Sequence, residues 1–111
     1  MIVISLLVNI LVLVPVCSGL ITDADWTEEA YGPATPARSI LLSIYLTIAL
    51  SSAALLVLRD PKFIAALLMV QVIYKLTTPF TVGTVANPVV VSNIAISVLH
   101  VVTLVVIWRS L

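Results

Sequence analysis

The sequence is poor in charged residues, cysteine, histidine and glycine. Only 9% of its 111 residues are charged, whereas 62% are hydrophobic, and the mean hydropathy is +1.29. So few polar residues cannot cover a water-soluble core. Five basic and five acidic residues give a formal net charge of zero, so the basic surface of a nucleic-acid-binding protein is missing. We expect the partners to be the lipid bilayer and membrane proteins, with no nucleic acid.

The rare residue types also exclude several kinds of chemistry. Cys17 is the single cysteine and His100 the single histidine, so we expect no intrachain disulfide and no metal or haem site. The five acids all lie outside the apolar runs, so His100 has no acid with which to form a catalytic triad. A proton-exchanging carboxylate inside the membrane, as in a small multidrug exporter, is missing too. We therefore predict no enzymatic activity and no cofactor.

Four long apolar runs fill most of the chain. Each of the last three begins with a capping residue followed by proline, in the pairs Thr35-Pro36, Asp60-Pro61 and Asn87-Pro88. Thr, Asp and Asn cap the free N–H groups of a first helical turn, and proline fits the first helical position. A run of about 20 apolar residues spans the hydrocarbon of a bilayer. We predict membrane spans at about residues 2–21, 36–58, 61–78 and 88–109.

The predicted fold is therefore all-α, an integral membrane antiparallel four-helix bundle that forms a single domain over residues 1–111. The short turn from Arg59 to Lys62 predicts an antiparallel hairpin and a compact middle of the protein. Pro79 is expected to end or kink the third span. The first run is read as a span and not as a secretory signal, because no basic residue precedes it.

A polar segment from Thr22 to Ala37 separates the first two spans. Asp25 and Glu28 have the spacing of a capping box, which predicts a short interfacial helix over residues 25–31, closed by Gly32-Pro33. Trp26 and Tyr31 suit the headgroup zone, as Trp108 does at the opposite membrane face, so we interpret all three as interfacial anchors. A lid over a ligand is the alternative for this segment.

The basic residues predict the orientation in the membrane. Arg59, Lys62 and Arg109 gather at one face, whereas Arg38 and Lys75 belong to the other, which also carries most of the acids. Lysine and arginine are retained on the cytoplasmic side. By a margin of one residue, both termini are predicted to be cytoplasmic.

Polar residues inside the spans are the candidate binding residues, because each must find a partner in the lipid. Asn9, Thr47, Gln71 and the helical turn from Ser97 to His100 are expected near the same depth and therefore to meet. His100 is expected to be neutral and to bond Gln71 or Asn9, with a proton relay or ligand contact as the alternative. Lys75 is expected to reach the headgroups and to pair there with a phosphate or with one of the acids Asp23, Glu28 and Glu29, or else to bind a solute or partner. The candidate set is Lys75, His100, Gln71, Asn93 and Asn9.

Small polar residues also form a stripe along the second span, at Ser39, Ser43, Thr47 and Ser51. Their spacing of four residues places them on one helical face. Small residues let membrane helices approach closely. We predict that this stripe is a helix-packing seam with no chemical role.

The arrangement of the chain resembles the DoxX-like group of small bacterial four-helix membrane proteins. The shared elements are a short first span, an outer loop ending in Gly32-Pro33, a second span led by Arg38, the tight Arg59 to Lys62 turn and two further helices. The resemblance covers the whole chain, assigns no site residue, and implies an accessory role in the bacterial inner membrane.

These observations favour a non-catalytic accessory or assembly subunit that packs against a larger membrane complex or against copies of itself. One alternative is a homo-oligomeric carrier or channel for an ion or small solute that uses Lys75, Asn93 and His100. Another is a module that binds a quinone or lipid near Tyr45, Tyr74 and His100.

Overall fold

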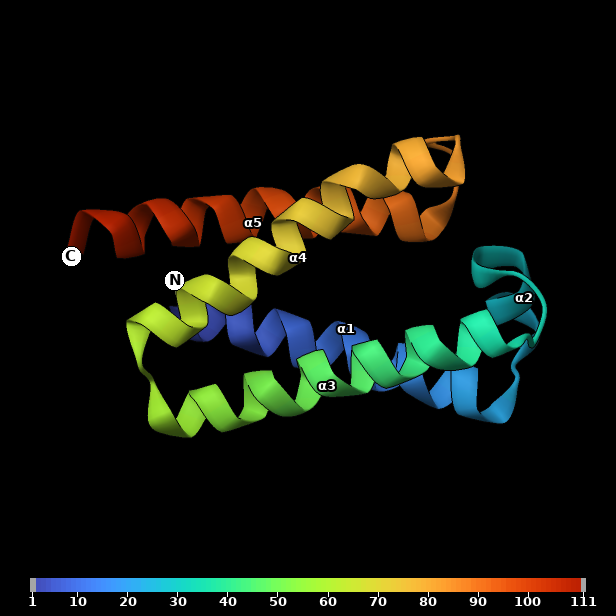
Figure 1. Ribbon diagram of the computed structural model, residues 1–111, viewed down its shortest axis with the longest axis horizontal. Coiled ribbons are helices and arrows are strands. Elements are labelled where there is room, and N and C mark those ends of the chain that lie inside the picture. The colour runs from blue at the N-terminus through green and yellow to red at the C-terminus, as the bar shows by residue number, and fades with distance from the viewer. Residues whose placement is uncertain (1, 111) are drawn as a thin grey trace.

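The computed structural model describes residues 2–110, which form five helices and no strand. The helices are α1 (Ile2–Thr22), α2 (Asp25–Tyr31), α3 (Pro36–Leu58), α4 (Pro61–Val82) and α5 (Pro88–Ser110) (Figure 1). All except α2 are long and apolar enough to cross a membrane. The predicted all-α four-helix architecture, with a short additional helix between the first two spans, is confirmed.

The three capping pairs begin their helices as predicted. The side chains of Thr35, Asp60 and Asn87 accept hydrogen bonds from the backbone N–H groups of Arg38, Lys62 and Val89, at 3.4, 3.0 and 2.8 Å respectively. These bonds satisfy donors that a first helical turn leaves free.

Helix α4 continues through Pro79 and ends at Val82, beyond the predicted boundary at residue 78. Proline removes the backbone bond that the Lys75 carbonyl oxygen would accept in a regular helix. The Thr78 hydroxyl donates to that oxygen at 2.6 Å instead. Gly83 then ends the helix with a φ of +85°. Because the helix is longer than expected, Lys75 lies about two turns, and not one, from its end.

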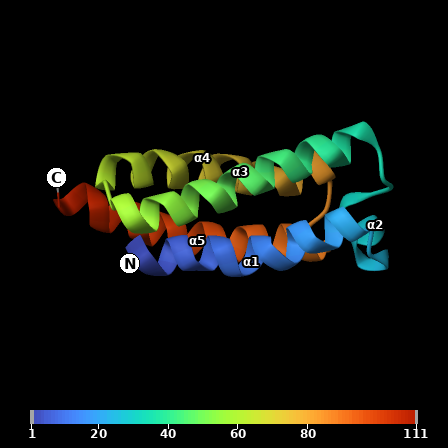
Figure 2. The same cartoon turned by 90° about the horizontal axis from the view of Figure 1, so that it is seen from below.

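The four long helices form two pairs. Helix α1 packs along α3 and α4 along α5, and α1 joins the pairs by its contact with α5 (Figures 1 and 2). Helices α3 and α4 are antiparallel but diverge from their connecting turn (Figure 1). The predicted antiparallel hairpin is confirmed, whereas the predicted compactness of the middle was wrong, because a tight turn fixes the helix ends and leaves the angle between the helices to packing.

Two clusters of buried apolar residues lie along the bundle. The cluster at the end with the chain termini comprises Leu6, Leu55, Ile64, Leu68 and Ile107. The cluster near α2 comprises Leu13, Cys17, Leu20, Tyr45 and Ile48. In lipid these contacts act through close packing, because acyl chains are as apolar as the side chains.

The predicted packing stripe on α3 does not form a seam between helices of this chain. Ser39, Ser43 and Thr47 are exposed and Ser51 is half-buried. The Ser43 and Thr47 hydroxyls donate to backbone carbonyls four residues earlier in their own helix, so they need no partner helix. The buried face of α3 instead carries Arg38, Tyr45, Ile48, Ser52 and Leu55.

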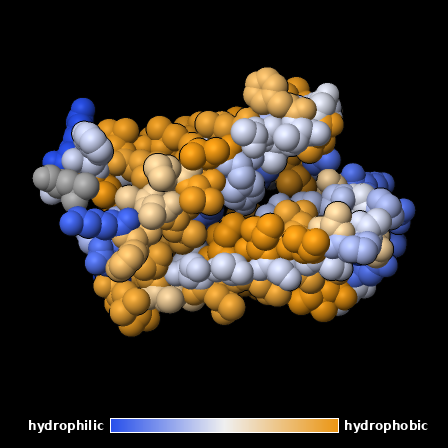
Figure 3. Space-filling view, in the orientation of Figure 1, coloured by the Kyte–Doolittle hydropathy of each residue, from blue (hydrophilic) through white to orange (hydrophobic). Residues whose placement is uncertain are grey.

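The surface has an apolar belt between two hydrophilic ends (Figure 3). One end holds α2 and its loops, and the other holds both chain termini and the turn between α3 and α4 (Figure 1). This distribution matches a bilayer, so the chain is an integral, polytopic membrane protein. Which end faces the cytoplasm stays a prediction, and Trp108, 79% exposed, stays a predicted anchor at the terminal end.

Helix α2 is fastened to the end of the bundle by Arg38. The guanidinium donates to Thr27 Oγ1, to the Gly32 carbonyl oxygen and to Asp23, with which it also forms an ion pair. Helix α2 begins at Asp25 with Ala24 as the N-cap residue and no side-chain cap bond. The predicted capping box is therefore absent, whereas Gly32 closes the helix as expected, with a φ of +88°.

Trp26 closes the contact between α2 and α1 by lying over Gly19. A Cβ atom on Gly19 would lie 2.2 Å from Cζ2 of the indole. Gly19→Ala should therefore displace the ring and destabilise the protein by about 1–3 kcal/mol, the usual cost of overpacking. Thermal unfolding in detergent, followed by Trp fluorescence and circular dichroism, measures the loss. In a Trp26→Ala background the same change should cost little, and an equal cost in both backgrounds would refute the assignment.

Candidate functional site

His100 is the centre of a buried hydrogen-bonded network in the middle of the bundle. Its Nε2 lies 2.9 Å from Asn9 Oδ1 and its Nδ1 lies 3.2 Å from Ser5 Oγ. Ser5 Oγ lies 2.6 Å from Thr103 Oγ1, and Asn9 Nδ2 donates to Ser52 Oγ at 3.1 Å. All five residues are 0–2% exposed. The network joins α1 to α5 and α3.

His100 was predicted to bond Gln71 or Asn9, and the structure shows the bond to Asn9. Of the two expected partners, Asn9 bonds the imidazole, and both ring nitrogens have partners. Thr47 is exposed and does not join the group. Gln71 is completely buried, but its Nε2 reaches only the Leu67 carbonyl oxygen, at 3.5 Å, and its Oε1 has no partner among residues 2–110. His100 therefore holds helices together and has no ring nitrogen free for a ligand.

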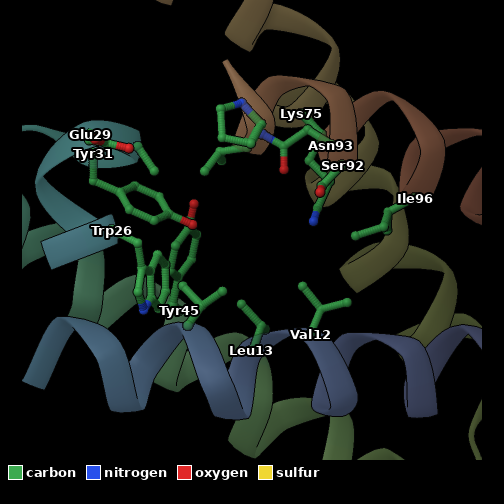
Figure 4. A pocket seen from close by; sticks show the side chains of 14 residues that line it. Val12, Leu13, Trp26, Glu29, Tyr31, Tyr45, Lys75, Ser92, Asn93 and Ile96 are labelled. Atoms are coloured by element: carbon green, nitrogen blue, oxygen red, sulfur yellow. The ribbon is translucent and has the colours of Figure 1, made fainter. Parts of the chain in front are cut away.

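The second candidate site is a cavity of about 390 Å³ beneath α2 (Figure 4). Apolar side chains of α1, among them Val12 and Leu13, form its floor, and Lys75 and Asn93 come from α4 and α5. Its volume is within the range of small-molecule sites, and an apolar lining with few polar groups is typical of them. The divergence of the helix pairs leaves this space.

Lys75 is the polar group that distinguishes the cavity. The side chain is 4% exposed and lines the cavity. Within residues 2–110, no carboxylate lies within 4 Å of Nζ and no hydrogen bond involves it; the Tyr74 ring centroid is 5.5 Å away. The expected pairing with an acid is not formed. Lys75 therefore presents to the cavity an ammonium group that has neither a carboxylate nor a hydrogen-bond acceptor as its partner.

Asn93 and the start of α5 form the wall beside Lys75. Asn93 is 5% exposed and its Nδ2 donates to Thr78 Oγ1 at 3.2 Å. Pro88 and Val89, the first residues of α5, also line the cavity. A helix N-terminus carries a partial positive charge, but Pro88 has no N–H and the Val89 N–H is bonded to Asn87 Oδ1, so Lys75 is the group of this wall that attracts an anion most strongly.

The opposite wall belongs to α2 and carries aromatic rings and an acid. Trp26, Glu29 and Tyr31 lie across the cavity from Lys75 and Asn93 (Figure 4). Tyr31 packs edge-on against Tyr45, with ring centroids 5.9 Å apart. Burial raises the pKa of the Tyr31 phenol, so its hydroxyl stays protonated and can donate a hydrogen bond. The two predicted anchors on α2 thus also face a cavity.

Further hollows extend the cavity between the helix pairs. A cavity of about 450 Å³ shares Tyr31, Tyr45 and Asn93 with the first. Another cavity of about 430 Å³ lies between α3 and α4, where the space-filling view shows a hollow (Figure 3). Tyr74 lines the 450 Å³ and the 430 Å³ cavities. The Tyr74 hydroxyl is buried without a partner in the described chain.

Comparisons of this chain with protein-family models, with curated proteins and with solved structures find no match. The resemblance to the DoxX-like group therefore stays a prediction, and the function has to be argued from the chain's own geometry.

Sequence reasoning identified part of this site. It selected Lys75 and Asn93, which meet at the cavity, and Asn9 and His100, which meet in the network. It treated these residues as one set. In the structure Lys75 and Asn93 line the cavity, whereas Asn9 and His100 bond each other and join helices. It named Glu29 only as one of three acids that could pair with Lys75 and did not include it in the candidate set, because only the folding of α2 over the bundle brings Glu29, and not Asp23, to this cavity.

The network yields a stability prediction. Asn9→Ala should leave His100 Nε2 and Ser52 Oγ unpaired inside the membrane and lower the free energy of unfolding by about 1–3 kcal/mol. Denaturation in detergent micelles measures the change. Thr47→Val is the matched control, because its hydroxyl bonds only its own helix and faces outward; comparable losses in the two variants would contradict the role of the network.

Proposed function

We propose that this small polytopic membrane protein is a non-enzymatic binding module that holds an amphiphilic small molecule in the cavity beneath α2. One observation carries the proposal: the Lys75 ammonium group faces the cavity while buried and unpaired. A charge at membrane depth is costly unless another group pairs with it. A ligand with an acidic or strongly hydrogen-bonding group would supply that pairing.

The walls of the cavity suit the apolar part of such a ligand. Val12, Leu13 and Val16 of α1 face Ile96 of α5 across it, and these helices are neighbours whose outer surfaces belong to the apolar belt. A ligand that dissolves in the bilayer would therefore reach the cavity laterally between α1 and α5. This combination favours an amphiphile over an ion or a hydrophilic solute.

The accessory-subunit role expected from the sequence has less support. The exposed apolar belt suits a neighbouring protein and bilayer lipid equally well, so it favours neither. Binding an amphiphile and belonging to a complex are also compatible, and a module of this kind would serve a larger assembly by holding its lipid.

The carrier or channel alternative is disfavoured by the centre of the bundle. The His100 network and the buried side chains of Leu6, Ile64 and Leu68 fill the region between the cavity and the terminal end. A continuous path for a solute would require these helices to separate and to leave the network's polar groups unpaired.

Lys75→Met tests the proposed function. Methionine keeps the length of the side chain and removes the charge, so the amount of small amphiphile that copurifies in mild detergent should fall by roughly tenfold, as expected when a charge-assisted contact is lost. Mass spectrometry of organic extracts measures it. Lys62→Met, in the exposed first turn of α4, is the control and should retain the wild-type amount; unchanged retention in Lys75→Met would overturn the proposal.

A further inference from the structure

We infer that the ligand is a zwitterionic phospholipid, whose phosphate binds at Lys75 and whose ammonium group binds at Glu29 with Trp26 and Tyr31. This inference rests on the proposed function and specifies its ligand class. It starts from the presence of two opposite charges on facing walls of one cavity, too far apart to pair with each other (Figure 4).

The order of these charges along the membrane normal matches a phospholipid. Lys75 lies inside the span, about two turns or roughly 10 Å from the end of α4. Glu29 is exposed on α2, which lies beside the last turn of α1 and the first turn of α3 at the end of the bundle (Figure 1). In a zwitterionic phospholipid the phosphate is joined to the glycerol backbone and the ammonium group extends toward water. The protein presents the complementary order, with the cation deeper and the anion nearer the solvent.

The phosphate end of the site has several donors. The Lys75 ammonium offers three N–H donors, and Ser92 adds a hydroxyl to the same cavity wall. The first turn of α5 also lines the cavity, and because the Val89 N–H is already bonded to Asn87 Oδ1, its contribution is the weak field of the helix end alone. Lys75 is the independent feature that points to an anion here, since its side chain is only 4% exposed and its ammonium group has no carboxylate and no hydrogen-bond acceptor among residues 2–110, with only the Tyr74 ring nearby.

The ammonium end is an acid beside aromatic rings. Glu29, Trp26 and Tyr31 lie together on the α2 wall (Figure 4). Aromatic faces bind ammonium and quaternary ammonium groups by cation–π attraction, and the carboxylate adds a direct charge. Contacts to Gly19 and Tyr45 hold the two rings in place. An anionic phospholipid without an ammonium group would place its phosphate at Lys75 but would offer no cation to the Glu29 carboxylate.

The volume of the cavity suits a headgroup and not a whole lipid. About 390 Å³ accommodates the phosphate, the ammonium group and the glycerol region, while the acyl chains leave between α1 and α5 into the bilayer. The apolar floor formed by Val12, Leu13 and Val16 faces the start of these chains.

Native mass spectrometry of the detergent-solubilised full chain tests the inference. The protein is titrated with phosphatidylcholine, phosphatidylethanolamine and phosphatidylglycerol of identical acyl chains. The wild type should bind the two zwitterionic lipids about tenfold more tightly than phosphatidylglycerol. Glu29→Gln should abolish this preference. Asp25→Asn, an equal charge change on α2 away from the cavity, should keep it, and Lys75→Met should weaken binding of all three lipids.

The outcomes separate the inference from the proposed function. The zwitterion inference is overturned if the wild type binds phosphatidylglycerol as tightly as the zwitterionic lipids or more tightly, or if Glu29→Gln and Asp25→Asn show the same lipid preference. Binding that still depends on Lys75 would in that case continue to support an amphiphile-binding module. If Lys75→Met leaves the affinity for all three lipids unchanged, both the zwitterion inference and the proposed function are overturned. Circular dichroism melts of each variant confirm that the bundle is folded before titration.

Discussion

The hydrogen bond between His100 and Asn9 is the interaction on which the arrangement of this bundle depends. Without a hydrophobic driving force between helices in lipid, packing and polar bonds must hold them together. The bond and its neighbours join one helix pair to the other at the middle of the membrane. Because contacts between the pairs are otherwise few, the pairs are free to diverge toward α2, and the divergence leaves the cavity.

Tertiary contacts also hold α2 in place over the cavity. Helix α2 is too short to be stable alone, so its position depends on the contacts of Arg38 with Asp23, Thr27 and Gly32 and on the Trp26 ring against Gly19. These contacts bring Glu29 opposite Lys75. The polar loop thereby becomes one wall of a site whose other wall lies within the membrane.

Much of the fold follows from local chemistry, whereas the candidate site follows only in part. The pairs that begin α3, α4 and α5 combine a capping side chain with proline, which acts within one turn and needs no tertiary information. The hydroxyl stripe from Ser39 to Ser51 misled the prediction because a hydroxyl in a membrane helix has two solutions, a partner helix or its own backbone. Pro79 was equally ambiguous, since Thr78 satisfies the carbonyl that proline leaves free.

The sequence by itself determined four membrane-spanning helices, their starts and the small set of polar residues that must avoid lipid, because hydropathy, caps and proline act over a few residues. Only the tertiary structure decided which of those polar residues meet. Asn9 and His100 satisfy each other, whereas Lys75 is left to face Glu29 across a cavity. The physical reason is that the rotation of each helix about its axis and the divergence of the pairs are set by contacts among all the helices together, which no single segment encodes.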